Sequence, residues 1–89
     1  MIQVTFSSSF KRAYKKLVKS NPQIQKQFDE KLKIFLNDPR DFRLKSHKLS
    51  GKLKDLWSFS INYQIRVIFY YLEKDKIVFE NIGSHDWVY

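Results

Sequence analysis

The N-terminal part of the chain begins with an alternating pattern of apolar and polar residues. Ile2, Val4 and Phe6 are separated by single polar residues, and this period of two predicts a short, half-buried strand. Three serines at positions 7–9 follow and provide alternative N-caps for a helix. The apolar residues of that helix recur at helical spacing: Phe10, Tyr14, Leu17 and Val18. The pattern therefore predicts a strand followed by an amphipathic helix.

A second helix is predicted directly after the first. Asn21 is a suitable N-cap and Pro22 fits the first turn of a helix, so these residues mark the boundary. A second apolar stripe then consists of Ile24, Phe28, Leu32, Phe35 and Leu36. Residues 37–39, Asn-Asp-Pro, end this stripe. Because the connection is so short, we expect the two helices to form an antiparallel hairpin.

The last third of the chain is rich in strand patterns. Residues 57–61 alternate between large apolar side chains and serine. Residues 65–72 are apolar throughout except for Arg66, which is typical of a central strand. A final strand is predicted over residues 77–82, and Gly83 is expected to end it.

The predicted fold class is α+β, with the whole chain, residues 1–89, forming one domain. The short connections make the last three strands an antiparallel meander. The first strand must join the same twisted sheet, with the helical hairpin on one face, for a single core to exist. The aromatic residues of segment 57–61 then face the helices, so Ser58 and Ser60 face the other side, which is left open to a ligand.

The chain is strongly basic, with 17 Lys or Arg residues against nine Asp or Glu and a net charge of +8. Such an excess favours a polyanionic partner, namely nucleic acid, an acidic protein or an anionic membrane; a solvated basic surface is the alternative. No apolar run approaches the ~20 residues of a membrane helix, and the N-terminus lacks the features of a signal peptide. The chain has no cysteine, which excludes disulfides and zinc–thiolate sites. We therefore expect a soluble, cytoplasmic protein without membrane association.

Few residues are candidates for catalysis. The sequence contains no phosphate-binding glycine loop and no HExxH motif. His85 and Asp86 are adjacent and point to opposite sides of an extended chain, so we expect neither a metal nor a cofactor.

A charge such as Arg66 inside an apolar strand needs a partner. This partner is either Glu80 on the next strand or a phosphate group, which suits the guanidinium fork. His47 and His85 are either incidental or take part in proton transfer.

Three segments of the second half carry a family resemblance: HKLSG at 47–51, LWSFSI followed by RVIF within 56–69, and IGSHDWVY at 82–89. In this combination the chain resembles the RelE/ParE superfamily of toxins from bacterial type II toxin–antitoxin modules, in particular the RelE-, YafQ- and YoeB-type mRNA interferases. The resemblance implies a RelE-like fold whose concave sheet face binds mRNA in the ribosomal A site. It also implies a metal-independent endoribonuclease, in which the ribose 2′-OH attacks the adjacent phosphate.

The resemblance implies roles for individual residues. Arg66 matches a strand arginine that contacts the phosphate or the transition state, and His85 matches a catalytic histidine near the C-terminus. His47 matches a second histidine that transfers a proton or positions the RNA. Asp86 and Tyr89 match the C-terminal edge of the site. There Asp86 orients a histidine or forms a cap, and Tyr89 stacks on a base or donates a hydrogen bond to phosphate.

One departure from the family pattern affects phosphate binding. Many RelE- and ParE-type sequences read Tyr-Arg-x-Arg where this chain reads Trp-Ser-Phe-Ser, so Ser58 and Ser60 replace two arginines. A serine hydroxyl donates one hydrogen bond but brings no charge. We therefore expect RNA binding to depend on these serines, on Arg66 and on the basic segment 40–54. The candidate lysines of that segment are Lys45, Lys48, Lys52 and Lys54. The missing arginines favour a histidine-based mechanism.

The resemblance also implies partners: a cognate antitoxin that neutralises the toxin, mRNA on the ribosome, and operator DNA reached through the antitoxin. Two other functions stay open. The first is a ParE-type toxin that inhibits DNA gyrase without cutting RNA, and the second is an inactive or DNA-binding module that acts with its antitoxin. The two histidines favour the nuclease, since inhibition of gyrase needs no acid–base pair.

Overall fold

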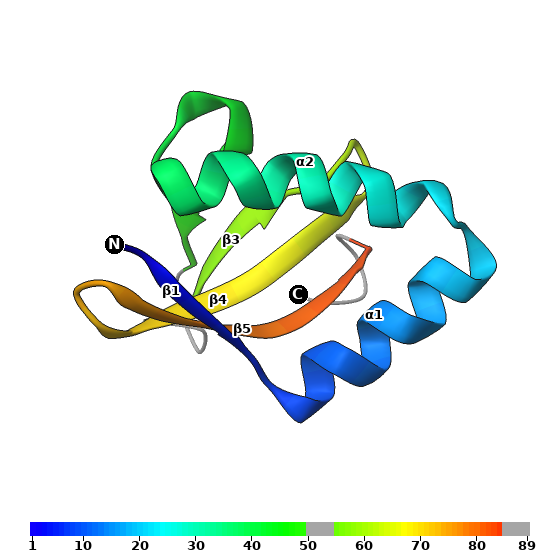
Figure 1. The fold of residues 1–89 in the computed structure, drawn as a ribbon, viewed down its shortest axis with the longest axis horizontal. Helices are drawn as coiled ribbons and strands as arrows, with labels where there is room; N and C mark the ends of the chain where they lie inside the picture. The colour runs from blue at the N-terminus through cyan, green and yellow to red at the C-terminus, as the bar shows by residue number, and fades with distance from the viewer. Residues whose placement is uncertain (50–54, 85–89) are drawn as a thin grey trace.

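The helices and longer strands follow the predicted order, and two short elements are added to them. The computed structural model describes residues 1–49 and 55–84 (Figure 1). Its elements are β1 (Gln3–Phe6), α1 (Ser8–Ser20), α2 (Gln23–Asn37), the 3₁₀ helix η1 (Phe42–Leu44), β2 (His47–Lys48), β3 (Trp57–Ser60), β4 (Ile65–Glu73) and β5 (Lys76–Ser84). The elements η1 and β2 lie in the basic segment and were not predicted, because they are too short to show a hydrophobic period.

The strands form one five-stranded sheet in the order β1-β5-β4-β3-β2. Strands β2 to β5 pair antiparallel, which confirms the meander. β1 pairs in parallel with the outer edge of β5, where Val4 lies opposite Ile77. The prediction that Gly83 ends the last strand is wrong: β5 continues to Ser84, and Gly83 lies opposite Arg66 inside the sheet.

A cluster of phenylalanine rings fills the space between the sheet and the helices. The ring of Phe79 on β5 lies at its centre, with centroid distances of at most 6.3 Å to the rings of Phe6, Phe10, Phe28, Phe35, Phe59 and Phe69. These rings come from β1, α1, α2, β3 and β4. Aromatic pairs at such distances contribute ~0.5–1.5 kcal/mol each beyond the burial of their area. One side chain of β5 therefore contacts both α-helices and three other strands.

A β-bulge in β5 lets residues with uneven spacing face this core. Ile77, Phe79 and Ile82 are all buried, although the spacing changes from two residues to three after Phe79. In a regular strand, a separation of three residues places side chains on opposite faces. The register of β5 against β4 shifts at this point, with Glu80 as the extra residue. The bulge therefore turns both Phe79 and Ile82 toward the helices.

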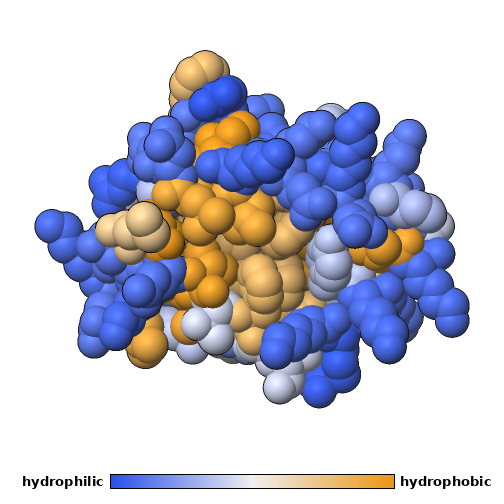
Figure 2. All heavy atoms as spheres, viewed as in Figure 1, coloured by the Kyte–Doolittle hydropathy of each residue, from blue (hydrophilic) through white to orange (hydrophobic). Residues whose placement is uncertain are grey.

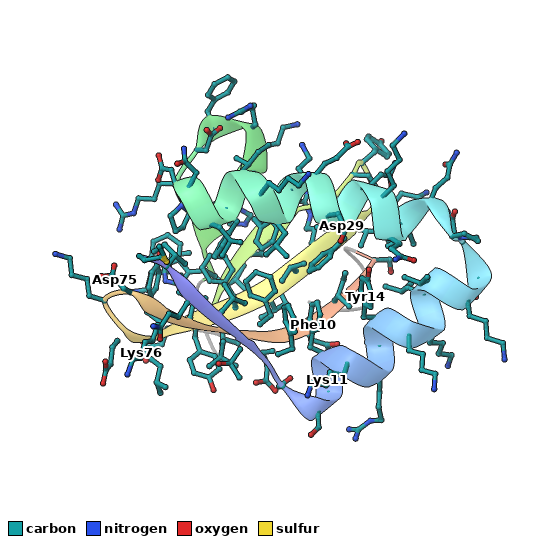
Figure 3. All side chains as sticks on the ribbon, in the orientation of Figure 1. Phe10, Lys11, Tyr14, Asp29, Asp75 and Lys76 are labelled. Carbon is teal, nitrogen blue, oxygen red and sulfur yellow. The ribbon has the colours of Figure 1, made fainter. Side chains whose placement is uncertain are left out.

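The helices α1 and α2 lie on the same face of the sheet and diverge from their connection (Figure 1). They meet where Tyr14 packs against Phe28, with ring centroids 5.0 Å apart. Figure 3 shows Phe10 and Tyr14 between α1 and the sheet. Burial, and secondly the charge of Asp29, raise the pKa of Tyr14. The predicted hairpin is thus an open V.

Within residues 1–49 and 55–84, no helix has the length and apolar character needed to cross a membrane.

Ser7 joins the start of α1 to the bulge. Its Oγ accepts a hydrogen bond from the backbone N–H of Phe10 at 3.0 Å and donates one to the carbonyl of Glu80 at 2.8 Å. The backbone N–H of Ser7 donates to the carbonyl of Phe79. Of the three serines at 7–9, Ser7 is therefore the N-cap, and its hydroxyl connects the helix to the sheet.

We expect Ser7→Ala to lower the free energy of unfolding by ~1–2 kcal/mol, because it removes both the cap and the bond to the bulge. Urea denaturation followed by circular dichroism measures this change. Ser9→Ala, at an exposed position within α1, is the matched control and should change the free energy by less than ~0.5 kcal/mol. Equal effects of the two substitutions would contradict the role of Ser7 as the cap.

Candidate functional site

Arg66 lies on β4, on the sheet face opposite to the helices. Its cross-strand neighbours are Ser60 on β3 and Gly83 on β5, and residues directly opposite each other share a face. The Nη1 atom of Arg66 donates a hydrogen bond to Oγ of Ser60 at 2.6 Å. Gly83 has no side chain, so its position leaves space for the guanidinium group. The register therefore places Gly83, and not Glu80, opposite Arg66.

A cavity of about 410 Å³ gathers four cationic side chains at this end of the sheet. Lys31 belongs to α2, Arg43 to η1 and Arg66 to β4, and Lys45 directly follows η1. The other described residues of the lining are Ser60, Ile61, Asn62 and Tyr63. No carboxylate belongs to the described part of this lining. Several positive charges around a small concave surface attract anions, and the volume is within the range of ligand sites, ~300–1,000 Å³.

Asp41 holds Arg43 at the edge of this cavity. Its carboxylate accepts hydrogen bonds from Nε of Arg43 at 3.0 Å, from Nη2 at 2.8 Å and from the backbone N–H at 2.9 Å. Mainly because of these hydrogen bonds, the pKa of Asp41 falls from 3.8 to about 2. Nζ of Lys31 donates to the carbonyl of Arg43 at 3.4 Å. The contacts fix η1 beside α2 and orient the guanidinium group of Arg43.

Lys45 adopts a left-handed backbone conformation, with φ 52° and ψ 41°. This conformation costs a residue with a side chain roughly 1–2 kcal/mol, so glycine is the residue that suits it best. The N–H of Lys45 donates to the carbonyl of Phe42 at 3.2 Å and thereby closes η1. Lysine at this position lowers stability but adds a positive charge to the cavity. Strain of this kind is characteristic of functional sites.

His47 and Lys48 form the short edge strand β2. His47 is exposed and lies opposite Ser58, on the same sheet face as Arg66. Its Nδ1 lies 3.3 Å from the carbonyl oxygen of Lys45. One strand separates β2 from β4, so their backbones lie roughly 10 Å apart. Lys48 lies opposite Trp57 and belongs to the other face. The structure therefore brings His47, but not Lys48, to the face that carries Arg66.

The two serines of β3 differ from the prediction in their exposure. Both lie on the face opposite to the core, because Phe59 between them contacts Phe35, with ring centroids 4.9 Å apart. However, Ser58 is 0% exposed and Ser60 only 8%, so the prediction of an open face is wrong at Ser58. β3 is flanked by paired strands on both sides, and Ile68 opposite Ser58 is buried as well. Ser58 is not accessible to RNA in this conformation, whereas Ser60 lines the cavity.

The remaining predicted site residues lie outside the described residues: Lys52, Lys54, His85, Asp86 and Tyr89. The described part of β5 ends at Ser84, which lies opposite Ile65, the residue before Arg66. Within residues 1–49 and 55–84, no three His, Asp or Glu side chains are grouped so that they hold a metal ion.

Sequence reasoning missed two cations of the cavity, Lys31 and Arg43. Arg43 belongs to the basic segment 40–54, and the Asp41-x-Arg43 spacing is a signal for an ion pair. No feature of the sequence distinguishes Lys31 from the other lysines on the polar surface of its helix. Its place in the cavity results from the position of α2 over the sheet.

Comparisons with known proteins agree with this fold. A family model described as "Bacterial toxin of type II toxin-antitoxin system, YafQ" matches residues 2–89. No curated protein sequence matches the chain.

Among solved structures, YafQ from E. coli is 16% identical to this chain. The TM-score is 0.80 for the structure of YafQ alone and 0.79 for YafQ in the DinJ–YafQ complex. Each match covers 100% of this chain and 99% of the other. A metal-bound toxin from Helicobacter pylori is 21% identical, with a TM-score of 0.81 and full coverage of both chains (100%). A YoeB/ParE toxin from Agrobacterium tumefaciens is 13% identical, with a TM-score of 0.79, and covers 94% of this chain and 99% of its own. These matches confirm the predicted RelE-like fold.

We expect Lys45→Gly to raise the free energy of unfolding by up to ~1 kcal/mol, because glycine adopts the left-handed conformation without strain. The same substitution should weaken the binding of single-stranded nucleic acid. The slope of log affinity against log salt concentration should fall by ~0.7, the value for one lost phosphate contact. Urea denaturation and fluorescence anisotropy measure the two effects.

Lys48→Gly is the control for this prediction, since it removes a lysine from the other sheet face. Glycine within a strand should lower the free energy of unfolding by ~0.5–1 kcal/mol, and the salt slope should stay unchanged. If Lys45→Gly leaves the slope unchanged, the role of Lys45 in anion binding is contradicted.

Proposed function

Because the chain belongs to the YafQ family of toxins from bacterial type II toxin–antitoxin systems, we propose that it is an endoribonuclease that cleaves mRNA in the ribosomal A site. The observation that carries this proposal is the cavity in which Arg66 lies together with three further cations, Lys31, Arg43 and Lys45. An RNA strand presents a phosphate at every nucleotide, and a concave site lined by cations suits such a ligand.

The proposed reaction is an attack of the ribose 2′-OH on the adjacent phosphorus atom. The bond from phosphorus to the 5′-oxygen breaks, which leaves a 2′,3′-cyclic phosphate and a 5′-hydroxyl. Negative charge increases on the phosphoryl oxygens in the transition state, and positioned cations stabilise it. Arg66 is the group that we assign to this charge, because a guanidinium group contacts two phosphate oxygens at once. The bond to Ser60 fixes its orientation.

The reaction also needs a base for the 2′-OH proton and an acid for the 5′-oxygen. We assign these roles to His47 and His85, without deciding which residue is the base. His47 lies on the same sheet face as Arg66. The described part of β5 ends opposite the residue before Arg66, and His85 is the next residue in the chain.

Two further residues are supporting candidates, Asp86 to orient a histidine and Tyr89 to contact a base or phosphate. Proton transfer and fixed cations suffice for the proposed reaction, so the proposal assigns no catalytic role to a metal ion. The ribosome would hold the mRNA in place, and such positioning lowers a barrier by about 7–11 kcal/mol. This contribution supports catalysis by few side chains.

We propose an antitoxin as the protein partner, as DinJ is in the complex with YafQ of E. coli. Two features of the surface support this proposal. α1 carries five Lys or Arg residues and no acidic residue. Figure 2 shows hydrophobic side chains at the surface between α1 and α2, bordered by hydrophilic ones. Partly buried apolar residues that pack against the core include Val4 and Phe6 on β1 and Leu32 on α2. An acidic segment with apolar anchors suits both features, and operator DNA would be reached through this antitoxin.

We expect Arg66→Ala to lower the rate of mRNA cleavage on programmed ribosomes by ~10²–10³, because a transition-state contact is lost. Binding of the mRNA should weaken much less. Primer extension maps and quantifies the cuts. Lys74→Ala is the control, since it removes a charge from the exposed β4–β5 turn and should leave the rate unchanged. An equal loss of rate and binding in Arg66→Ala would make Arg66 an affinity residue only.

We expect His85→Ala to reduce cleavage by ~10²–10⁴, the usual contribution of a general acid or base. Growth arrest after induction should disappear, while the circular dichroism spectrum and antitoxin binding stay unchanged. Unchanged cuts in the variant would contradict the role of His85. A toxic parent protein that makes no cuts in mRNA, and causes gyrase-linked DNA breaks instead, would favour the gyrase inhibitor.

A further inference from the structure

Tyr63 is an unusually exposed aromatic residue at the edge of the cationic cavity. It lies in the β3–β4 turn, 94% of its surface is exposed, and it belongs to the cavity lining. Most aromatic residues of this chain pack in or against the core, where their large apolar area stabilises the fold. Tyr63 contributes almost nothing in this way, since burial is the source of that stabilisation.

The turn that carries Tyr63 is held in a defined conformation. Oδ1 of Asn62 accepts hydrogen bonds from the backbone N–H groups of Gln64 and Ile65, both at 2.8 Å. Nδ2 of Asn62 donates to Oε1 of Gln27 on α2, also at 2.8 Å. These contacts close the turn and connect it to a helix. The ring of Tyr63 is therefore presented to solvent from a rigid support, which reduces the entropy lost when a ligand binds.

We propose that Tyr63 is a stacking platform for a nucleobase of the bound RNA, next to the cations that contact its phosphates. This inference rests on the proposed function and adds a base-contacting subsite to it. Single strands are bound by surfaces that combine positive charge along the backbone with aromatic rings under the bases. The cavity has both parts, because Arg43, Lys45 and Arg66 line it together with Tyr63. Every base has a π-face, so the platform is not selective for one base.

Phe42 provides a natural control for this inference. It is also a large aromatic residue with high exposure, 85%, and it lies on η1 beside Arg43. It is not among the described residues that line the cavity. If exposed aromatic rings in general strengthened RNA binding, Phe42 and Tyr63 would contribute equally. The proposal requires that only Tyr63 does so.

The test is fluorescence anisotropy with two labelled oligonucleotides of the same length, measured at low salt. One is 2′-O-methyl RNA, which cannot be cleaved by 2′-OH attack, and the other has abasic residues and therefore phosphates without bases. Tyr63→Ala should weaken binding of the first by about 5- to 100-fold, the range for one stacked base. It should change binding of the abasic strand by less than ~2-fold, since the charges stay in place. Tyr63→Phe and Phe42→Ala should bind both like the parent.

The outcomes separate this inference from the proposed function. If Tyr63→Ala binds the 2′-O-methyl RNA as tightly as the parent, the stacking platform is overturned. The proposal is also overturned if the substitution weakens the binding of both oligonucleotides equally, or if the parent protein binds neither oligonucleotide. Cleavage of ribosome-bound mRNA by the parent tests the proposed function independently. Circular dichroism verifies that each variant is folded, which the exposure of both rings leads us to expect.

Discussion

The packing of the Phe79 ring is the interaction on which the rest of the structure depends. This ring contacts phenylalanines from both α-helices and from β1, β3 and β4. A chain of 89 residues has a small core and a correspondingly small margin of stability. Large rings around one centre provide much of that core from few residues. The fold therefore requires β5 to place Phe79 under both helices at once.

This requirement also determines the geometry of the candidate site. Both Phe79 and Ile82 face the core only because Glu80 forms a bulge between them. Gly83, the residue after Ile82, lies opposite Arg66. A larger side chain at this position would occupy the space of the guanidinium group. The N-cap Ser7 hydrogen-bonds the carbonyl of Glu80, so α1 is anchored at the same bulge. Core packing and the position of Arg66 thus depend on one irregularity in β5.

The sequence predicted the elements in which hydrophobic residues recur at regular spacing. The two helical stripes and the alternation of β3 gave the order of elements and the face of Ser60, and a lone charge in an apolar strand drew attention to Arg66. The bulge had a signal as well, in the uneven spacing of Ile77, Phe79 and Ile82. The cavity had no such signal in the sequence, because Lys31 and Arg43 reach it only through the tertiary position of α2 and η1. The burial of Ser58 was likewise not predictable, because the exposure of a strand residue depends on tertiary packing.

The parallel pairing of β1 with β5 has a consequence for the synthesis of the chain. The strand β1 finds its partner only when β5 has been made, and Phe79, the centre of the core, lies on β5 as well. Until then β1 has no strand to pair with, and both helices lack the central ring against which their phenylalanines pack. A nascent chain therefore has no completed core before β5 has been translated. If mRNA on the ribosome is the substrate, as proposed, this order of assembly protects the transcript that encodes the protein until β5 has been made.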